Sequence, residues 1–252
     1  MTSFFDCYCG LGYLTAPAFG QEFPTAQELQ VALEDAGIDA ALVFSPAAFE
    51  YDPFLANQAL MEEIAGHANL HPCWVLLPPA TGEQPPPLEL VTLMAEQGVR
   101  AARLAPGRTR NNFSLAAWSV DPLLEALAQA HVPVFLDLDE SDWPEIAALL
   151  ARHPTLPLVL TNVTYRVDRY LYPLWERHDN LYVEISGYQG LRAIEAAVLR
   201  FGPERLLFGT HMPRFTPGAA LAAVTCAEIS ANARTLIAGG NLRRLLEAAH
   251  GH

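Results

Sequence analysis

The stretch Glu204-Arg205-Leu206-Leu207-Phe208-Gly209-Thr210-His211-Met212-Pro213 contains a short apolar run. Arg205 precedes the run, and the chain-breaking residues Gly209 and Pro213 follow it. We expect Leu206 to Phe208 to form a strand buried on both faces, because the run is apolar throughout and is ended by Gly209 and Pro213. His211 then lies just beyond the carboxyl end of this strand. In an α/β barrel this end of each strand carries the chemistry, because the following loops shape a pocket over a rigid base.

Apolar, strand-like runs alternate with helical patterns along the rest of the chain. We expect eight strands, at residues 3–8, 40–44, 73–77, 99–104, 132–138, 156–161, 181–185 and 206–210. The first helix starts with a capping-box signature, Thr25 and Glu28. This alternation predicts an α/β fold, a (β/α)8 TIM barrel that forms a single domain over residues 1–252. A doubly wound open sheet is the alternative, but the first strand is not followed by a phosphate-binding glycine fingerprint.

Composition and charge narrow the class of protein. The chain has 252 residues, 51% of them hydrophobic, which is enough for one large core. Its formal charge of -13 disfavours nucleic acid and anionic membrane surfaces as partners. It has no signal-peptide pattern and no apolar run of about 18 residues. The four cysteines lie in or beside apolar segments, which predicts buried, reduced thiols. We therefore expect a cytoplasmic protein that acts on a small-molecule substrate.

Several short motifs occur in a recognisable order. They are Asp6 at the end of the first strand, the segments from Asp35 to Asp39, Gly98 to Leu104 and Asn180 to Ser186, the opening stretch, and the segment from Gly239 to Leu246. Together they resemble the amidohydrolase-related (amidohydrolase 2) family of metal-dependent hydrolases and decarboxylases. The resemblance extends over nearly the whole chain and implies an amidohydrolase-like TIM barrel.

The resemblance also implies a divalent metal site, and here the sequence departs from the family. The Asp-x-His-x-His motif of the family's first strand is replaced by Asp6-Cys7-Tyr8-Cys9-Gly10. The family's fifth-strand and sixth-strand histidines fall on Asp137 and Asn162, and its eighth-strand aspartate falls on His211. Catalytic zinc takes about three protein ligands, and only Asp137 and His211 are good ligands here, with Tyr8 a poor third. We therefore expect no conventional zinc site, and the cofactor stays unknown.

The two cysteines of the first strand are conceivable substitute ligands. Strand alternation, however, predicts that Cys7 and Cys9 point away from Tyr8, toward the helices. Of the eight histidines, only His211 is expected on the catalytic face.

A group of polar side chains is expected to converge on the pocket. We predict His211 as a general base oriented by Asp137, with Tyr8 and Asn162 as further catalytic groups. Substrate-binding roles are predicted for Arg103, Ser186 and Glu184. The alternative is structural: a buried Arg103–Asp137 ion pair, a turn satisfied by Asn162 and an aromatic plug formed by Tyr8.

Two functions remain open at this point. The first is a hydrolase of a small carboxylated or cyclic ester, lactone or amide without the usual metal centre, since the wider superfamily includes lactonases that work without metal. The second is a catalytically inactive barrel that serves as a ligand-binding or structural module. Loss of every metal ligand favours the second, whereas polar replacements in costly buried positions favour the first. The aromatic and basic residues from Tyr165 to Tyr172 indicate a substrate lid, a homo-oligomer contact or a solvated helix face.

Overall fold

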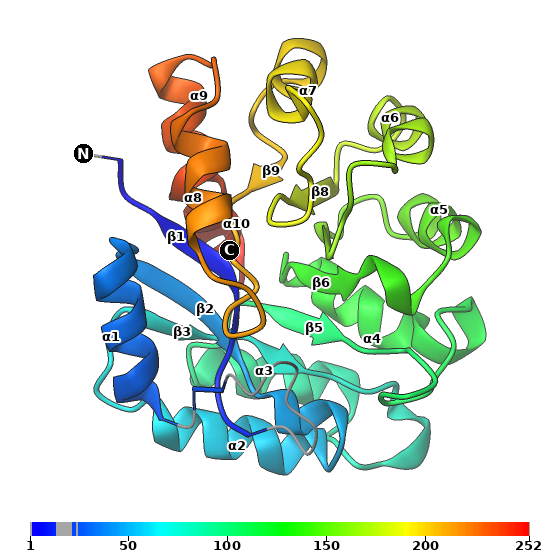
Figure 1. Cartoon of the computed structure of the whole chain (residues 1–252). Coiled ribbons are helices and arrows are strands. Elements are labelled where there is room, and N and C mark those ends of the chain that lie inside the picture. Colours follow the sequence, from blue (N-terminus) through cyan, green and yellow to red (C-terminus); the bar gives the residue numbers. More distant parts are fainter. Residues whose placement is uncertain (1, 14–21, 24, 252) are drawn as a thin grey trace.

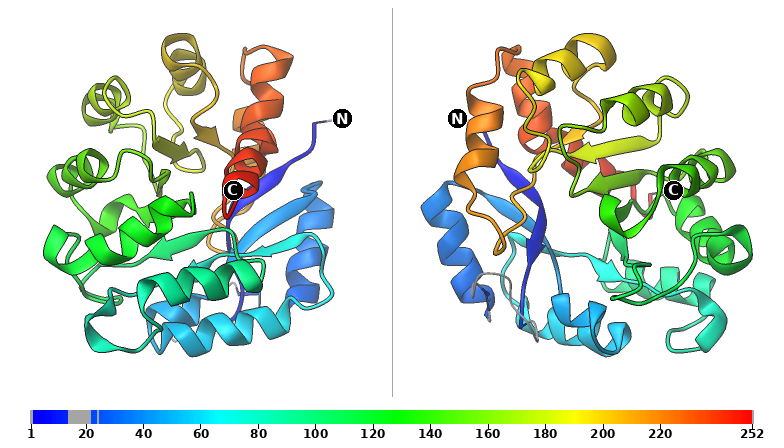
Figure 2. Two further views of the ribbon diagram at one scale, coloured as in Figure 1. Left: turned by 180° about the vertical axis from the view of Figure 1, so that it is seen from behind. Right: turned by 45° about the vertical axis from the view of Figure 1, so that its right-hand side comes forward.

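The computed structural model describes residues 2–13, 22–23 and 25–251. The sequence predicts a loop rich in glycine, aromatic residues and proline at residues 10–23, and most of it lies outside the described residues. Strands and helices alternate along the chain, and the helices surround the strands (Figures 1 and 2). The strands are β1 (Phe5–Gly10), β2 (Ala40–Phe44), β3 (Leu70–Pro72), β4 (Trp74–Val75), β5 (Ala102–Leu104), β6 (Val134–Asp137), β7 (Leu158–Thr161), β8 (Leu181–Glu184) and β9 (Leu206–Leu207). The helices are α1 (Ala26–Ala36), α2 (Pro53–Glu63), α3 (Pro87–Glu96), α4 (Ala117–Gln129), α5 (Trp143–Arg152), α6 (Asp168–Trp175), α7 (Ala193–Phe201), α8 (Gly218–Thr225), α9 (Ala231–Thr235) and α10 (Asn241–Ala248).

All strand pairs in these ladders are parallel and follow the chain order. One ladder joins β1, β2 and β3, and the other runs from β4 to β9. Further backbone hydrogen bonds connect the two ladders. The Cys73 N–H, between β3 and β4, donates to the Val43 carbonyl (2.7 Å), while the Cys7 and Gly10 N–H groups of β1 donate to the carbonyls of Phe208 (3.0 Å) and Met212 (2.9 Å) after β9. The strands therefore follow one another around a barrel, as the alternation predicts.

Two short strands lie at and just before the third predicted strand. β3 pairs with β2, and β4 pairs with β5, with Cys73 between them. The predicted strand at residues 73–77 corresponds to β4 alone. β3 precedes the predicted range and was not expected, because the chain exchanges one neighbouring strand for another at Cys73. The capping box of α1 is confirmed: the Thr25 side chain accepts from the Glu28 N–H, and the Glu28 side chain accepts from the Thr25 N–H.

Apolar side chains fill two regions. The barrel interior is packed with Phe5, Leu42, Val75, Phe135 and Leu207, each at most 3% exposed. A larger layer between the strands and the helices includes buried residues of the helices themselves, such as those of α1, α4 and α5. Helix α10 contacts β1 and β9 and adds three leucines to the interior. This apolar base holds the polar carboxyl ends of the strands in place.

A β-bulge changes which way β1 presents its cysteines. Between the pairs Asp6–Ala41 and Cys9–Val43, β1 contains one residue more than β2. Cys7 and Tyr8 consequently both pack in the barrel interior, whereas Cys9 packs in the outer layer. The prediction that Cys7 points toward the helices is therefore wrong, because the bulge interrupts the alternation.

All four cysteines are free thiols, as predicted, but Cys226 is exposed rather than buried. Within the described residues, no helix has both the length and the apolar character that crossing a bilayer requires.

Candidate active site

A cavity of about 460 Å³ opens at the carboxyl ends of the strands. It receives residues from the ends of β1, β2 and β6 and from the segments that follow β5 and β9. The lining residues are Tyr8, Gly10, Phe44, Pro46, Phe49, Glu50, Gly107, Arg108, Thr109, Arg110, Asp137, Asp139, Glu140, His211, Met212, Pro213 and Arg214. The cavity thus lies on the face at which the sequence placed His211.

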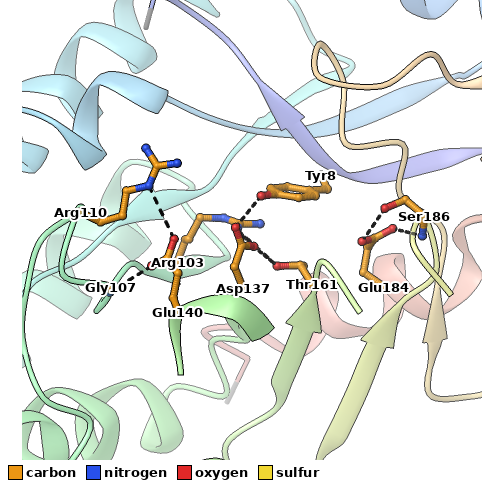
Figure 3. A network of polar contacts seen from close by, with 9 residues as sticks. All are labelled: Tyr8, Arg103, Gly107, Arg110, Asp137, Glu140, Thr161, Glu184 and Ser186. Atoms are coloured by element: carbon orange, nitrogen blue, oxygen red, sulfur yellow. Dashed lines mark hydrogen bonds and ion pairs between the residues drawn. The ribbon is translucent and has the colours of Figure 1, made fainter. Parts of the chain in front are cut away.

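Asp137 is the centre of a hydrogen-bond network at the floor of this cavity (Figure 3). Its Oδ1 accepts from Arg103 Nη1 (2.8 Å) and from the Thr161 hydroxyl, and its Oδ2 accepts from the Tyr8 hydroxyl (2.8 Å). Burial raises the pKa of Asp137, but the Arg103 guanidinium and the hydrogen bonds outweigh burial, so the pKa lies below its ordinary value. Asp137 is therefore an ionised carboxylate whose two oxygens both have partners.

Arg103 lies beneath Asp137 and is almost fully buried. Its side chain is 2% exposed, and its guanidinium carbon lies 4.2 Å from the centroid of the Tyr8 ring and 4.5 Å from that of Phe44. Arg103 is not among the residues that line the cavity. The structure thus contains the buried Arg103–Asp137 pair that the sequence offered as the alternative to a substrate-binding role.

The ring of His211 lies against that of Tyr8, with the ring centroids 3.9 Å apart and the ring planes tilted by 43°. The residue is 8% exposed, its Nδ1 is buried without a partner, and no described side chain forms a hydrogen bond with it. Burial lowers the pKa of His211 to about 3, and the positive charges of Arg103 and Arg214 act in the same direction, whereas Asp137 opposes them. The imidazole is therefore neutral at pH 7. Asp137 does not contact it through a direct hydrogen bond but reaches it through Tyr8.

Three further residues predicted for the site lie apart from the cavity lining. Glu184 accepts from the Ser186 N–H and from the Ser186 hydroxyl (3.0 Å), so these two residues bind each other. Burial raises the pKa of Glu184 to about 7. Asn162 adopts a left-handed conformation (φ 56°), which suits the turn role that the sequence offered as its alternative. None of the three is among the lining residues.

The aromatic and basic cluster also lies away from the cavity lining. It falls on and before α6, where Tyr165 and Tyr170 are more than half exposed and Tyr170 stacks on Trp143. Its assignment to an oligomer contact stays a prediction.

Glu140 is a cavity residue that the sequence reasoning missed. It ends the 3₁₀ turn Leu138–Glu140, which directly follows β6. Its side chain is 11% exposed; one carboxyl oxygen lies 3.9 Å from Arg110 Nε, and the other accepts from the Gly107 N–H at 3.4 Å. Burial, together with the negative charge of Asp137, raises the pKa of Glu140 to about 7. The available signal was the acidic run from Asp137 to Glu140 at the end of a predicted strand.

A buried carboxyl group joins β1 to the segment that carries His211. Asp6 is fully buried and accepts from the Tyr8 N–H (2.9 Å), from the Thr210 N–H (3.0 Å) and from the Thr210 hydroxyl. Burial raises the pKa of Asp6 to about 6, although these hydrogen bonds act against the rise. Asp6 thereby fixes Tyr8 and His211 relative to each other.

Fold and site together define an α/β barrel with a polar cavity at the carboxyl ends of its strands. Residues 16–248 match the sequence model of the Amidohydrolase family, and the chain belongs to this family. No curated protein matches the chain significantly.

Solved structures share the fold at low sequence identity. The chain is similar to 5-carboxyvanillate decarboxylase from Sphingomonas paucimobilis (12% identity, TM-score 0.70, 98% of this chain and 99% of that chain). It is also similar to a probable 2-pyrone-4,6-dicarboxylic acid hydrolase from Acinetobacter baumannii with citric acid bound (15%, 0.71, 98% and 100%). A third relative is dihydroxybenzoic acid decarboxylase from Polaromonas with bound manganese and an inhibitor, 2-nitroresorcinol (16%, 0.72, 98% and 97%). At these identities the likeness concerns the fold alone.

The side chains at the family's metal positions do not fit a divalent metal. Among residues 2–13, 22–23 and 25–251, no three His, Cys, Asp or Glu side chains are grouped so that they could hold an ion. Asp137 already forms an ion pair with Arg103, whose Nη1 lies 2.8 Å from the Asp137 Oδ1. In the part of the chain that the structure describes, the rings beside His211 are those of Tyr8 and Phe215. The side chains at these positions therefore form an ion pair beside an aromatic cluster and not a set of metal ligands.

Proposed function

We propose that this member of the Amidohydrolase family is a hydrolase of small, carboxylated, cyclic esters (lactones) and related esters or amides, and that it works without a divalent metal. One observation carries the proposal: a neutral histidine, His211, opens onto a cavity whose rim carries Arg108, Arg110 and Arg214. Arginine suits carboxylate recognition because its planar guanidinium can form two parallel hydrogen bonds.

The other side of the cavity suits a small ring. Tyr8, Phe44 and Phe49 line it, and aromatic faces pack favourably on planar ligands. The structural relatives are named for small carboxylated rings: a pyrone dicarboxylic acid, a carboxyvanillate and a dihydroxybenzoic acid. These names support the same substrate class for this chain.

In the proposed reaction His211 accepts a proton from the attacking water. Its lowered pKa keeps the imidazole unprotonated and ready to accept, although it also makes the free imidazole a weak base. An anionic substrate beside the ring raises the pKa, so the base strengthens when the site is filled. Tyr8, held by Asp137, supports the ring from one side. Asp137 thus acts as an indirect orienter.

The test is a hydrolysis assay over a panel of carboxylated lactones and aryl esters, with the protein kept in a metal chelator. We expect turnover in the chelator and a loss of about 10²- to 10⁴-fold in kcat for His211→Ala at an unchanged melting temperature. His178→Ala is the matched control, because His178 precedes β8 and therefore lies at the opposite end of the barrel. Unchanged turnover in His211→Ala would remove His211 from the mechanism. Activity that needs added zinc or manganese would refute the metal-free chemistry.

A ligand-binding module without catalysis is the second candidate. It is favoured by the bonding of Asp137, because both carboxylate oxygens already accept hydrogen bonds, from Arg103, Thr161 and Tyr8. Saturable binding of carboxylated rings, with no turnover of any member of the panel, would select this candidate.

A further inference from the structure

Glu140 is poised between two charge states on the wall of the cavity. Its nearest cation, Arg110, is at 3.9 Å, which is too long for a close ion pair. Arg110 is itself 37% exposed, and its guanidinium lies 5.1 Å from the centroid of the Phe49 ring, at the rim of the same cavity. Arg110 is therefore positioned to turn from Glu140 to an incoming anion.

We propose that Glu140 takes up a proton when a carboxylated ligand enters the cavity, and that protonated Glu140 then donates this proton to the leaving oxygen of the substrate. The donor step rests on the hydrolase function proposed above. The proton uptake requires only that the cavity binds a carboxylate.

The charges around Glu140 explain the direction of the change. A bound carboxylate adds a negative charge near Glu140 and competes for Arg110, and both effects disfavour the ionised form of a half-buried acid. Because burial already raises the pKa of Glu140 to about 7, a small further rise changes its protonation at neutral pH. The charged and titratable groups that face the same cavity are Tyr8 from β1, Glu50 after β2, Arg108 and Arg110 after β5, Asp137 and Asp139 around the 3₁₀ turn, and His211 and Arg214 after β9, with Arg103 beneath Asp137.

The reaction balances with these two groups. The oxygen of water forms a bond to the ester carbon while one water proton passes to His211. The ring C–O bond then breaks, and the leaving oxygen takes the proton of Glu140. The proton on His211 returns to the Glu140 carboxylate through solvent, so the net change is the addition of one water to the substrate.

Calorimetry with isophthalate tests the proton uptake, because this dicarboxylate ring contains no bond that the enzyme would hydrolyse. Titrations at pH 8 in phosphate and in Tris, whose ionisation enthalpies differ, report the protons taken up. For a rise of about one pKa unit we expect about 0.4 proton at pH 8 and about 0.1 at pH 6, and an affinity that falls about threefold between pH 7 and pH 8. Glu140→Gln should bind without proton uptake, whereas Glu125→Gln, which removes an exposed acid on α4 outside the cavity lining, should retain it.

The outcomes separate the two parts of the proposal. Proton uptake that persists in Glu140→Gln, binding of the wild type without uptake, or no binding of isophthalate at millimolar concentration would each overturn the uptake. If Glu140→Gln does not fold, the pH dependence of wild-type affinity decides by itself.

For the donor step, Glu140→Gln should lose kcat on alkyl lactones but retain it on nitrophenyl esters, whose leaving oxygen needs no proton. Equal losses on both would overturn the donor role, and uptake without any turnover would refute the hydrolase function alone.

Discussion

Replacing Arg103 by methionine should destabilise the protein far more than it alters ligand binding. Arg103 is 2% exposed, and its partner Asp137 is 13% exposed, with 2.8 Å between Nη1 and Oδ1. The guanidinium also lies over the rings of Tyr8 and Phe44. Without it, Asp137 is a nearly buried carboxylate that retains only two hydroxyl donors. The sequence alone left open whether Arg103 instead holds the substrate.

The size of the effect follows from the desolvation of the pair. Breaking a buried ion pair by removing one partner costs about 3–5 kcal/mol, because the remaining charge is left uncompensated. Asp137→Asn should cost a similar amount, since it strands Arg103. In the double variant neither charge is left alone, so its loss should fall about 3 kcal/mol short of the sum of the single losses. A loss of 4 kcal/mol corresponds to a fall in melting temperature of about 10 °C for a chain of this size.

Urea unfolding of the wild type and the three variants, followed by tryptophan fluorescence, gives the coupling free energy directly. Arg110→Met is the control, because this arginine is 37% exposed and its 3.9 Å pair should contribute less than about 1 kcal/mol. The pH dependence of the free energy of unfolding is a second test. Since the pKa of Asp137 is lowered in the folded state, its contribution is present above the ordinary value of 3.8 and is lost as the pH falls through the folded pKa. Losses that simply add in the double variant, or an Arg103→Met protein as stable as wild type, would refute the structural role of the pair.

Two further predictions concern the buried carboxyl group beside the site. Glu184 has a pKa raised from 4.5 to about 7, so the folded state disfavours its ionised form, and wild-type stability should decline as the pH rises from about 4.5 to 7. Glu184→Gln should flatten the stability curve in this window, which chemical denaturation at several pH values measures; an unchanged slope would assign the pH dependence to other groups. Gly209→Ala should cost about 1–3 kcal/mol, because a Cβ there would lie 2.6 Å from Glu184 Cγ and push the carboxyl group off Ser186. Gly218→Ala, where a Cβ meets nothing within 4 Å, is the control, and equal stability of the two variants would contradict the packing argument.

The barrel could be predicted because its signals are local. Alternating apolar runs and helix caps lie within short windows of sequence, and the position of His211 after a strand follows from chain direction alone. The failures concern register and pairing. The bulge that turns Cys7 inward depends on how β1 meets β2, and the division at Cys73 depends on which neighbour each half of the strand pairs with.

The side-chain pairings within the site also depend on strand register. Arg103 pairs with Phe135 across β5 and β6, which places Asp137 two residues further along the neighbouring strand. No sequence window contains this register, so a structural ion pair and a substrate-binding arginine looked alike. Glu140 was missed for a different reason: its unusual charge state arises from burial beside Asp137, not from its residue type.

The Arg103–Asp137 pair also disfavours a divalent metal ion at Asp137. A dication bound to Asp137 would lie within about 4–5 Å of the guanidinium, and at an effective dielectric constant of about 20 the repulsion would be about 7 kcal/mol. Arg103 thus supplies the positive charge that keeps Asp137 ionised, but a guanidinium cannot bind a water oxygen as a Lewis acid and lower the pKa of that water as a metal ion does. In the hydrolysis that we propose, the attacking water must therefore give its proton to a side chain. The neutral imidazole of His211 is our candidate for this acceptor, and Glu140, whose pKa is raised to about 7, is our candidate for the group that protonates the leaving oxygen.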